Sequence, residues 1–582
     1  MQDCSTGAIL DHSTDSAGVI EDAITNAPPG GRIFIKAGTY TFTTINAGTV
    51  GAIGTVTASI YNIELYGEGN ATDLVAGTNL NSNMIVVDAG GWYIHDLQID
   101  GNRAAQSASG NGAPFMDGIS GGGIYYDNNL VVQHCYIHDV KDFGIGVYGN
   151  SVKILDNYIT NTNANGIQIN GIAGGASDYL VEGNSIVGFS DVGISVSGSS
   201  PNPAISGALV TNNYVYNGLL GLSPFSVNSG DGIYVGDNGA ASNITVSGNQ
   251  IYNVKGGIVS SPGGSGTIYN TNIALLGNQI HETTSNGMYA QKTTKLSIVD
   301  NVLDSVDTSG GGTGQSGINL SNSGVTGAEV VGNTLFSVGT TTNNYGIYVN
   351  GPSGTIVEDN FINVTSGNGI NVFTPSNNNT ITGNHIEETG GAGIAVYTSN
   401  GNIITSNRVD NPASGKNGIT LFNSFGNFII GNNVSRVTGT GIILSSGCQH
   451  NTVQGNDVRG DTTAFADSGS LNVVSGNIGY NPKGHIASPW ISTGSLLGDT
   501  GGSSTPTNQT TYTVNDSPKL LLVVIGSGWT SAHTLVIQVD GTQVISTNAP
   551  AGNTVYTFNL NPGQTFCIQY QAARATFVVS GE

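Results

Sequence analysis

One short unit recurs along most of this chain, and it limits the possible folds more than any other feature. Each copy begins with Gly-Ile, continues with alternating apolar and polar residues, and is followed by an Asn with an apolar residue two places later. The glycines of the unit are Gly123, Gly144, Gly166, Gly193, Gly232, Gly257, Gly287, Gly317, Gly346, Gly369, Gly393, Gly418 and Gly441. The Asn residues are Asn157, Asn184, Asn213, Asn249, Asn278, Asn301, Asn333, Asn360, Asn384, Asn407, Asn432, Asn456 and Asn477. Such a period of 21 to 36 residues predicts a repeat architecture.

The stretches inside each unit are short and strand-like. GIGVYG, GIQING, GISVSG and GIYVGD alternate with period two, and helical periodicity is almost absent. Short strands joined by Gly and Asn turns predict a parallel β-solenoid, whose coils stack about 4.8 Å apart. We expect the recurrent Asn to form an internal ladder, in which each amide bonds backbone and the Asn of the next coil. Cys135 holds the equivalent place one repeat earlier.

The two ends of the chain differ from the repeats. SAGVIEDAITNAPPGGRIFIKAGTYTF predicts a short amphipathic helix, a turn and two strands, a cap of about residues 1–50 that covers the open end of the first coil. The coils then run over about 51–485, NPKGHIASPW closes them, and this solenoid domain spans 1–492. Residues 493–510 are a Gly/Ser/Thr linker, and 511–582 predict a small antiparallel, sandwich-like β-domain.

The composition excludes several classes of protein. Charged residues make up only 9% of the 582 residues, and the net charge is −23, so nucleic acid is excluded as a partner. No apolar run approaches the roughly twenty residues of a membrane helix. The start, MQDCSTGAIL, shows no signal peptide. The four cysteines are widely spaced and contain no CxxC pair, which indicates neither a zinc site nor a disulfide scaffold.

A family resemblance rests on three motifs. The opening pattern AIxxAPxGGxIxIxxGTY, the LQIDGNR at 97–103 and the serial GN-x-I coils resemble the pectin-lyase-like superfamily over roughly residues 8–485. The resemblance implies an all-β chain, a right-handed parallel β-helix with an N-terminal helical cap. That superfamily contains polysaccharide lyases, glycoside hydrolases, uronate epimerases and phage tailspikes, so the fold does not choose an activity. The DPHD motif of the epimerases and the NTD, DD and RIK set of the polygalacturonases are missing.

A stripe of residues is expected on the outside of one sheet. If each Ile after the repeat Gly points inward, the next residue points outward. The candidate substrate-binding residues of this stripe are Tyr125, Gln168, Tyr234, Tyr289 and Tyr348. Tyr148, Asn170, Phe373, Tyr397 and Phe422 occupy the next outward position. Rings that stack on pyranose faces, beside amides that bond hydroxyls, suit a sugar polymer; equally, aromatic residues can stack rung on rung only to stabilise a sheet.

Carboxylates near this stripe are the candidate catalytic residues. Asp142 and Asp191 stand two residues before their repeat glycines, two coils and therefore about 9–10 Å apart, which suits an inverting glycosidase. Asp231 lies one coil from Asp191 and would make a closer pair of the retaining kind, about 5 Å apart. Asp117 and Asp127 lie on the N-terminal side of the same face. Asp-Gly at 117–118 and 231–232 is also an ordinary turn signal.

The same residues also permit a lyase. Asp142 and Asp191 could hold Ca²⁺ against a uronate carboxylate, while Lys255, Lys141 or His138 removes the adjacent proton. A face with so few cations would repel a polyuronate unless metal ions bridged it, and this favours hydrolysis of a neutral or weakly charged polymer. On the hydrolytic mechanism no metal or other cofactor is required, and calcium belongs to the lyase alternative.

Three classes of function follow. The leading prediction is an endo-acting glycoside hydrolase that uses paired carboxylates on the outer face, with a polysaccharide lyase or a calcium-dependent epimerase as the alternative. The second class is a virion or cell-surface fibre, a homotrimer rather than a monomer. The third class is a carbohydrate-binding scaffold without activity. In each case the partner is a polysaccharide, and the location is extracellular or at a cell or virion surface.

Overall fold

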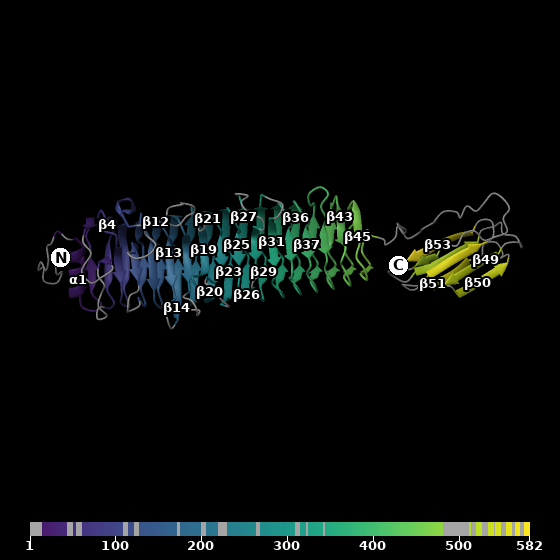
Figure 1. Ribbon diagram of the computed structural model, residues 1–582, viewed down its shortest axis with the longest axis horizontal. Helices are drawn as coiled ribbons and strands as arrows, with labels where there is room; N and C mark the ends of the chain where they lie inside the picture. The colour runs from purple at the N-terminus through teal and green to yellow at the C-terminus, as the bar shows by residue number, and fades with distance from the viewer. Residues whose placement is uncertain are drawn as a thin grey trace.

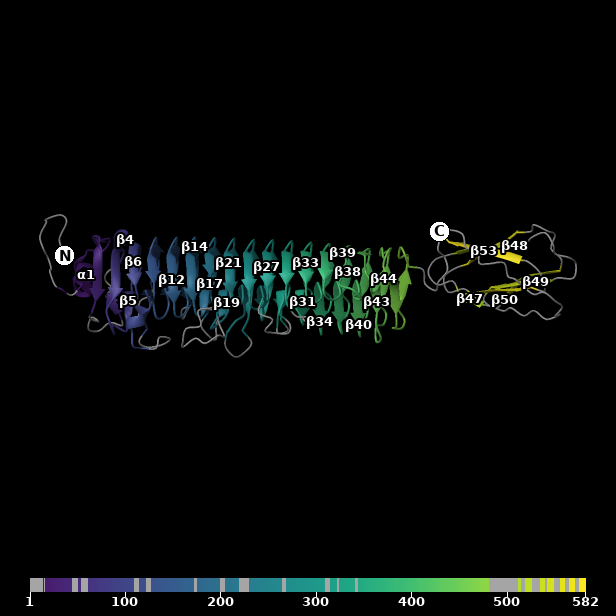
Figure 2. The same cartoon turned by 90° about the horizontal axis from the view of Figure 1, so that it is seen from above.

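The chain folds into a long parallel β-helix, capped at its N-terminal end by the helix α1 (Ser16–Asn26) (Figures 1 and 2). The computed structural model describes residues 14–480 except 15, 44–50, 54–60, 109–114, 122–126, 172–174, 199–204, 219–229, 264–267, 309–314, 322–323 and 341–343, together with the strand backbones between 511 and 581. The fold class expected from the sequence, a right-handed parallel β-helix with a helical cap, is confirmed. Ala17, Ile20 and Ile24 form the buried face of α1, as an amphipathic cap requires.

Each full coil contributes three strands to three parallel ladders. One is a separate 16-stranded sheet, whose strands are β3 (Gly51–Ile53), β5 (Asn83–Val87), β7 (Ile119–Gly121), β10 (Ile145–Tyr148), β13 (Ile167–Asn170), β16 (Val192–Ser197), β19 (Asp231–Asp237), β22 (Ile258–Ser260), β25 (Met288–Ala290), β28 (Ser316–Leu320), β31 (Tyr345–Asn350), β34 (Ile370–Phe373), β37 (Ile394–Tyr397), β40 (Ile419–Phe422), β43 (Thr440–Leu444) and β45 (Thr463–Asp467).

The other two ladders form one 30-stranded sheet, because the long strands β4 (Glu64–Ala76) and β6 (Tyr93–Asp100) belong to both. Ladder one continues through β8 (Val131–Gln133) and β11 (Lys153–Leu155) to β44 (Thr452–Gln454) and β46 (Val473–Ser475). Ladder two continues through β9 (Tyr136–His138) and β12 (Tyr158–Thr162) to β36 (His385–Thr389), β39 (Arg408–Asp410) and β42 (Asn433–Ser435).

The predicted Asn ladder is confirmed, and it runs along the corner between ladders one and two. Nδ2 of Asn157 donates to Oδ1 of Asn184 at 2.9 Å, and the same bond repeats in every coil to Asn477. The backbone N–H of Cys135 donates to Oδ1 of Asn157, so Cys135 does hold the equivalent place one coil earlier. A second column of Asn residues was not predicted from the sequence. It joins Asn379, Asn402, Asn427, Asn451 and Asn472 by the same side-chain hydrogen bond.

The repeat glycines let neighbouring coils approach closely. A Cβ on Gly166 would lie 2.7 Å from the carbonyl oxygen of Gly193 and 2.4 Å from Cγ2 of Ile186. The earliest such glycine among the described residues is Gly118 rather than the predicted Gly123, because Ile119 pairs with Ile145. Gly123 lies outside the described residues.

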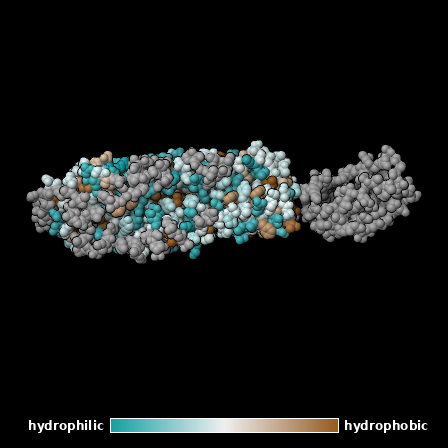
Figure 3. All heavy atoms as spheres, in the orientation of Figure 1, coloured by the Kyte–Doolittle hydropathy of each residue, from teal (hydrophilic) through white to brown (hydrophobic). Residues whose placement is uncertain are grey.

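The C-terminal strands pair antiparallel, as the fold class predicts. β47 (Thr511–Thr513), β52 (Thr565–Tyr570), β49 (Thr534–Val539) and β50 (Thr542–Asn548) form one sheet, and β51 (Val555–Leu560), β48 (Lys519–Ile525) and β53 (Ala575–Gly581) form another. NPKGHIASPW and the predicted linker lie outside the described residues. Before them the last described coils expose Leu471, Val473 and Ile478, and hydrophobic surface gathers at this end of the β-helix in Figure 3.

Candidate catalytic site on the 16-stranded sheet

The outward stripe predicted from the sequence is an in-register column. Its members are Ser120, Gly146, Gln168, Ser195, Tyr234, Val259, Tyr289, Asn319, Tyr348, Asn371, Ala395, Thr420 and Ile443. The prediction placed Tyr125 beside Gly146, whereas the register gives that place to Ser120. Tyr125 lies outside the described residues.

The residue directly before each repeat glycine has a structural task, and we call this place the cap position. Here an Asn side chain accepts, through Oδ1, a hydrogen bond from the backbone N–H at the cap position of the next coil. Asn165, Asn286, Asn368 and Asn417 make this bond at 2.8–2.9 Å. The side chain also faces the outward stripe, since Nδ2 of Asn165 donates to Gln168 and Nδ2 of Asn368 to Asn371.

Asp231 occupies the cap position where β19 begins. Its Oδ1 accepts the backbone N–H of Gly256 at 3.0 Å, as an Asn would. The turn role inferred from Asp-Gly is therefore real, but an amide would perform it without burying a charge. The pKa of Asp231 is raised to about 6, chiefly by burial; Lys255 and the Gly256 N–H lower it, and Asp191 and Asp237 make smaller contributions that raise it. Asp231 is thus a recessed carboxyl group that takes up a proton near neutral pH.

Two further carboxylates interact with Asp231. Asp191 stands immediately before Val192, which pairs with Asp231 in the next coil. Asp237 ends β19, where a register shift beyond Val196 places it opposite Ser197, and its Oδ2 accepts Oγ–H of Ser195 at 2.9 Å. Burial, and then Asp191, raise the pKa of Asp237, while the Ser195 hydrogen bond lowers it. Asp237 was not among the predicted site residues, although the GIYVGD unit places an Asp there.

Tyr234 lies in the stripe three residues after Asp231, the separation of Asn165 and Gln168. Burial raises the pKa of Tyr234 to about 12, and Asp237, Asp231 and Tyr289 add to the shift, so these groups lie close together. A hydroxyl that stays protonated can donate to a sugar or a carboxylate. Asp191, Asp231, Asp237, Ser195, Tyr234 and Lys255 form what we call the β19 site.

Asp142 belongs to a different group, toward the N-terminal end of the same sheet. It is 1% exposed and interacts with Asp117, whose pKa lies well above the ordinary range because of burial and of Asp142. Asp117 sits at a cap position, with Oδ1 accepting the N–H of Phe143 at 3.1 Å. Asp127 is also fully buried, and its carboxylate accepts the N–H of Tyr148. The structure thus brings Asp142 to Asp117, and Asp191 to Asp231.

The three bases predicted for a lyase are dispersed. Lys255 interacts with Asp231 in the β19 site. Nζ of Lys141 donates to the carbonyl oxygen of Gln106 at 2.6 Å, and His138 projects from β9 in ladder two. Gln168, predicted to bind substrate, is 7% exposed and hydrogen-bonded to Asn165 and Asn170 within its own coil. Tyr289 and Tyr348 remain partly exposed in the stripe.

Aromatic side chains extend along the sheet beyond the β19 site. The ring centroids of Tyr345 and Tyr348 are 4.9 Å apart, and those of Tyr348 and Phe373 are 6.3 Å apart. The centroid of Phe373 lies 6.1 Å from that of Tyr397, which lies 6.3 Å from that of Phe422. Phe373 and Phe422 are 38% and 40% exposed. The rings are therefore in tilted contact, with interplanar angles of 49–55°, and Phe373 and Phe422 are also exposed to solvent.

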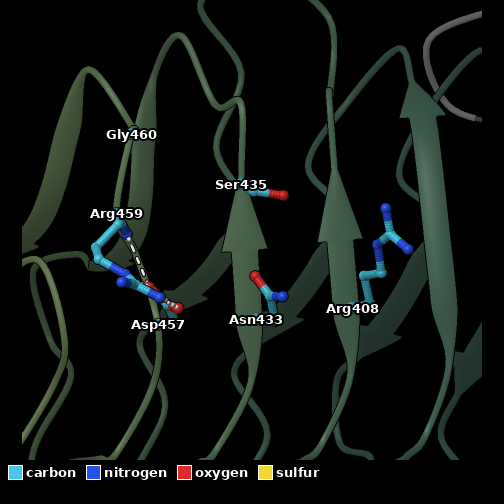
Figure 4. A pocket seen from close by; sticks show the side chains of 6 residues that line it. All are labelled: Arg408, Asn433, Ser435, Asp457, Arg459 and Gly460. Carbon is cyan, nitrogen blue, oxygen red and sulfur yellow. Dashed lines mark hydrogen bonds and ion pairs between the residues drawn. The ribbon is translucent and has the colours of Figure 1, made fainter.

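An open cavity of about 500 Å³ lies elsewhere, on ladder two near its C-terminal end (Figure 4). Arg408, Asn433, Ser435, Asp457, Arg459 and Gly460 line it. Arg459 turns back onto Asp457, with Nη2 2.7 Å from Oδ2. The cavity thus has cationic walls, but its carboxylate is already paired with arginine and its pKa is lowered by that contact. It lacks the proton donor that the β19 site has.

Comparison with known proteins bears on the fold. A family model described as a right handed beta helix region matches residues 4–273, 171–341, 268–416 and 312–458. No curated protein sequence matches significantly. Similar solved structures include the tailspike of Escherichia coli bacteriophage HK620 in complex with a pentasaccharide, 12% identical, over 100% of this chain and 92% of that one, with a TM-score of 0.47.

Two others are the A-module of a mannuronan C-5 epimerase from Azotobacter vinelandii and a surface adhesin of Streptococcus pneumoniae. The first is 17% identical over 82% of this chain and 99% of that one, with a TM-score of 0.21. The second is 15% identical over 70% of this chain and 91% of that one, with a TM-score of 0.39. In the described part of the chain, no helix has the length and apolarity to cross a bilayer.

Proposed function

This chain belongs to the right-handed β-helix family, and on that premise we propose that it hydrolyses a polysaccharide at the β19 site. The observation that carries the proposal is Asp231, a carboxyl group with its pKa raised to about 6 at a place where other coils use Asn. Asp117 is also an Asp at a cap position, but it is only 3% exposed, whereas Asp231 is partly exposed beside the stripe and can meet a substrate. A glycosidase gains an acid that is still protonated in weakly acidic solution.

The proposed reaction divides two roles between neighbouring carboxylates. Protonated Asp231 donates its proton to the glycosidic oxygen as the bond to the anomeric carbon breaks. Asp191, as carboxylate, stabilises the positive charge that develops on the sugar ring, and water finally supplies the hydroxyl group to the anomeric carbon. Burial is the main cause that raises the pKa of Asp231, and the neighbouring Asp191 and Asp237 add smaller contributions in the same direction, which favours the protonated acid.

The aromatic stripe supplies a direction for the polymer. Tyr234 and Tyr289 lie in the same column as Tyr348, and a series of tilted ring contacts continues from Tyr348 to Phe422. Pyranose rings that lie along the helix axis would meet one aromatic edge or face every coil or two. Such a track suits internal cleavage of a long chain, and a polymeric substrate of this kind is met outside the cell or at its surface.

Elimination on a uronate polymer is the second candidate, and Lys255 favours it. Lys255 interacts with Asp231, so a base and an acid stand together, and calcium could neutralise the uronate carboxylate. The two reactions leave different products. A panel of neutral and uronic polysaccharides, with and without calcium, separates them: hydrolysis releases reducing ends alone, whereas elimination also creates ultraviolet-absorbing unsaturated ends.

The decisive variant is Asp231→Asn, which keeps the cap hydrogen bond to Gly256 and removes the acid. We expect activity to fall by about 10²–10⁴-fold. Asp117→Asn is the matched control, because Asp117 also occupies a cap position and accepts the N–H of Phe143 in the next coil. This variant should leave activity unchanged. Equal activity of both variants would refute the proposal. Binding to the panel without any products would instead indicate a fibre or a binding scaffold.

A further inference from the structure

A second cluster of ionisable side chains lies away from the β19 site, on the outer face of ladder two near the N-terminal cap. Asp100 and His138 are direct neighbours across the β6–β9 pairing, and Asp139 follows His138. Nδ1 of His138 lies 3.0 Å from Oδ2 of Asp139 and 3.8 Å from Oδ1 of Asp100. One ligand atom from each residue falls within 4.8 Å of the others, and among the described residues no other such set of three occurs.

The backbone is what turns Asp139 toward His138. Asp139 has a left-handed conformation with φ of 49°, at the corner where ladder two ends. Asn161, Asn253 and Asn411 adopt the same conformation at this corner in other coils. The corner therefore accepts Asn, and the carboxylate at 139 is an addition to what the fold requires.

Two buried polar atoms beside this cluster have no hydrogen-bond partner. They are Nε2 of His138 and Oδ1 of Asp73. Asp73 interacts electrostatically with both His138 and Asp100. A histidine that binds a metal through one ring nitrogen characteristically presents the other to a carboxylate. Nε2 of His138 is the nitrogen left for such a contact, and Asp73 is a nearby carboxylate.

We infer that Asp100, His138 and Asp139 form a binding site for a divalent transition-metal ion of the zinc class. One imidazole nitrogen and two carboxylate oxygens are ligands that Zn²⁺ accepts, and water would complete a tetrahedron. Ligands about 2.1 Å from such an ion lie about 3.4 Å from one another, close to the observed 3.0 and 3.8 Å. Calcium requires six to eight oxygens and fits this set poorly.

The neighbouring Arg103 does not occupy the carboxylate oxygen of Asp139 that faces His138. Nη2 of Arg103 lies 3.7 Å from Oδ1 of Asp139, the oxygen that faces away from His138, and Nη1 donates to the carbonyl oxygen of Asn161. Asp100 Oδ1 accepts the backbone N–H of Asn102 at 2.7 Å, which orients this carboxylate. The two charges of Asp100 and Asp139 would be neutralised by one divalent ion, which would link two successive coils beneath the cap.

The chain contains its own control. His281 and Asp304 are also in-register neighbours on ladder two, and Glu282 follows His281 with the same left-handed conformation. Nδ1 of His281 lies 3.7 Å from Oδ2 of Asp304, but the hydroxyl of Tyr252 hydrogen-bonds to Glu282, and His281, Glu282 and Asp304 do not form a set of three ligand atoms within 4.8 Å of one another. His281→Gln therefore removes an imidazole with similar neighbours from outside the proposed site.

The test is isothermal titration of Zn²⁺ into the full-length chain after chelator treatment, with Ca²⁺ titrated in parallel. We expect one Zn²⁺ per chain, and a loss of affinity of at least about tenfold in His138→Gln, Asp139→Asn and Asp73→Asn. His281→Gln should bind as the unaltered chain does. Asn adopts the left-handed conformation of residue 139 in other coils, so Asp139→Asn should fold normally, and circular dichroism should confirm this. The test therefore remains valid even if His138→Gln does not fold.

Three results would overturn the inference. They are absence of Zn²⁺ binding by the unaltered chain, unchanged affinity in Asp139→Asn, and an equal loss in His281→Gln. Tighter binding of Ca²⁺ than of Zn²⁺ would also exclude a site of this class. None of these measurements depends on polysaccharide cleavage.

Discussion

Arg436 donates from Nε to Oδ1 of Asp410 at 2.7 Å, and only 3% of the Asp410 side chain is exposed. Arg436, and then Ser435 and Arg408, hold the pKa of this carboxyl group below its ordinary value, against the effect of burial. A carboxyl group whose pKa is lowered by folding stabilises the protein above its unfolded pKa, and this contribution is lost as the pH falls through the folded value.

We therefore predict that Asp410→Asn lowers the free energy of unfolding by about 1–2 kcal/mol at pH 7. The difference from the unaltered chain should shrink as the pH falls below about 4, where the unfolded chain takes up the proton, and should be smallest below the lower folded pKa, where Asp410 is protonated in both states. Thermal unfolding followed between pH 2 and pH 7 measures this, and a difference that is independent of pH would contradict the assigned cause.

Asp231 should have the opposite effect on stability. Its pKa is raised by folding to about 6, so the folded state loses stability as the pH rises from about 4 through 6. At pH 7.5 we expect Asp231→Asn to be more stable than the unaltered chain, by up to about 3 kcal/mol from a shift of about two units. Urea unfolding at pH 4 and pH 7.5 tests this, since the gain should appear only at the higher pH.

The rate of polysaccharide cleavage should depend on the same proton. If protonated Asp231 is the general acid, kcat/KM falls as the pH rises above about 6, because the fraction of protonated enzyme falls. A rate that is flat from pH 5 to pH 8 would assign the acid to another residue. In the elimination alternative the rate should rise over the same range, as a base loses its proton.

Exposed aromatic residues allow a paired test of the polymer track. Phe373, two residues after the stripe residue Asn371 in β34, is 38% exposed, and Phe336, whose ring contacts Phe361 on ladder two, is 37% exposed. We expect Phe373→Ala to weaken polysaccharide binding by roughly five- to tenfold, corresponding to about 1–1.5 kcal/mol of stacking. Phe336→Ala should leave binding unchanged. Affinity electrophoresis in polysaccharide gels compares the two variants directly.

Removing any single Asn side chain from the ladder should lower the free energy of unfolding. In Asn278→Ala the backbone N–H and the side-chain amide of Asn249 lose their acceptor, and the carbonyl oxygen of Val246 loses its donor. Each buried group left unsatisfied costs about 1–3 kcal/mol, so we expect a loss of about 3–5 kcal/mol. Cys135→Asn should be tolerated, because Oδ1 of Asn157 already accepts the N–H of Cys135. Chemical unfolding of both variants checks the contrast.

The Asn ladder and the stripe were predictable because every coil solves the same packing problem. Asn157 and its successors recur at one corner, so their spacing alone indicated bonds between neighbouring coils. The position of the repeat glycine in the earliest coil was harder to predict, because both DGIS at 117–120 and GGGIYY at 121–126 contain Gly-Ile. Only pairing with Ile145 distinguishes Ile119 from Ile124, and pairing is a property of the assembled sheet.

The acidic groups could be predicted only in part. Counting coils placed Asp191 and Asp231 in adjacent coils, and the pairing of Val192 with Asp231 agrees with this. The same counting linked Asp142 to Asp191, but it cannot show that Asp142 interacts with Asp117 at a corner closed to solvent. Asp237 was missed because a register shift after Val196, invisible to strict alternation, carries it toward Ser195.

The Asn ladder also makes the β-helix electrically polar. In every link from Asn157 to Asn477 the side-chain oxygen faces the preceding coil and one side-chain N–H faces the next coil. The second N–H donates to a backbone carbonyl of the preceding coil, as that of Asn278 does to Val246. The column from Asn379 to Asn472 points the same way. Aligned amide dipoles add, as they do along an α-helix, so the positive pole faces the last coil and the negative pole faces the cap. The two ends of the solenoid therefore differ in the charge they accept: an anionic neighbour is stabilised near Asn477, and a cationic one near Cys135.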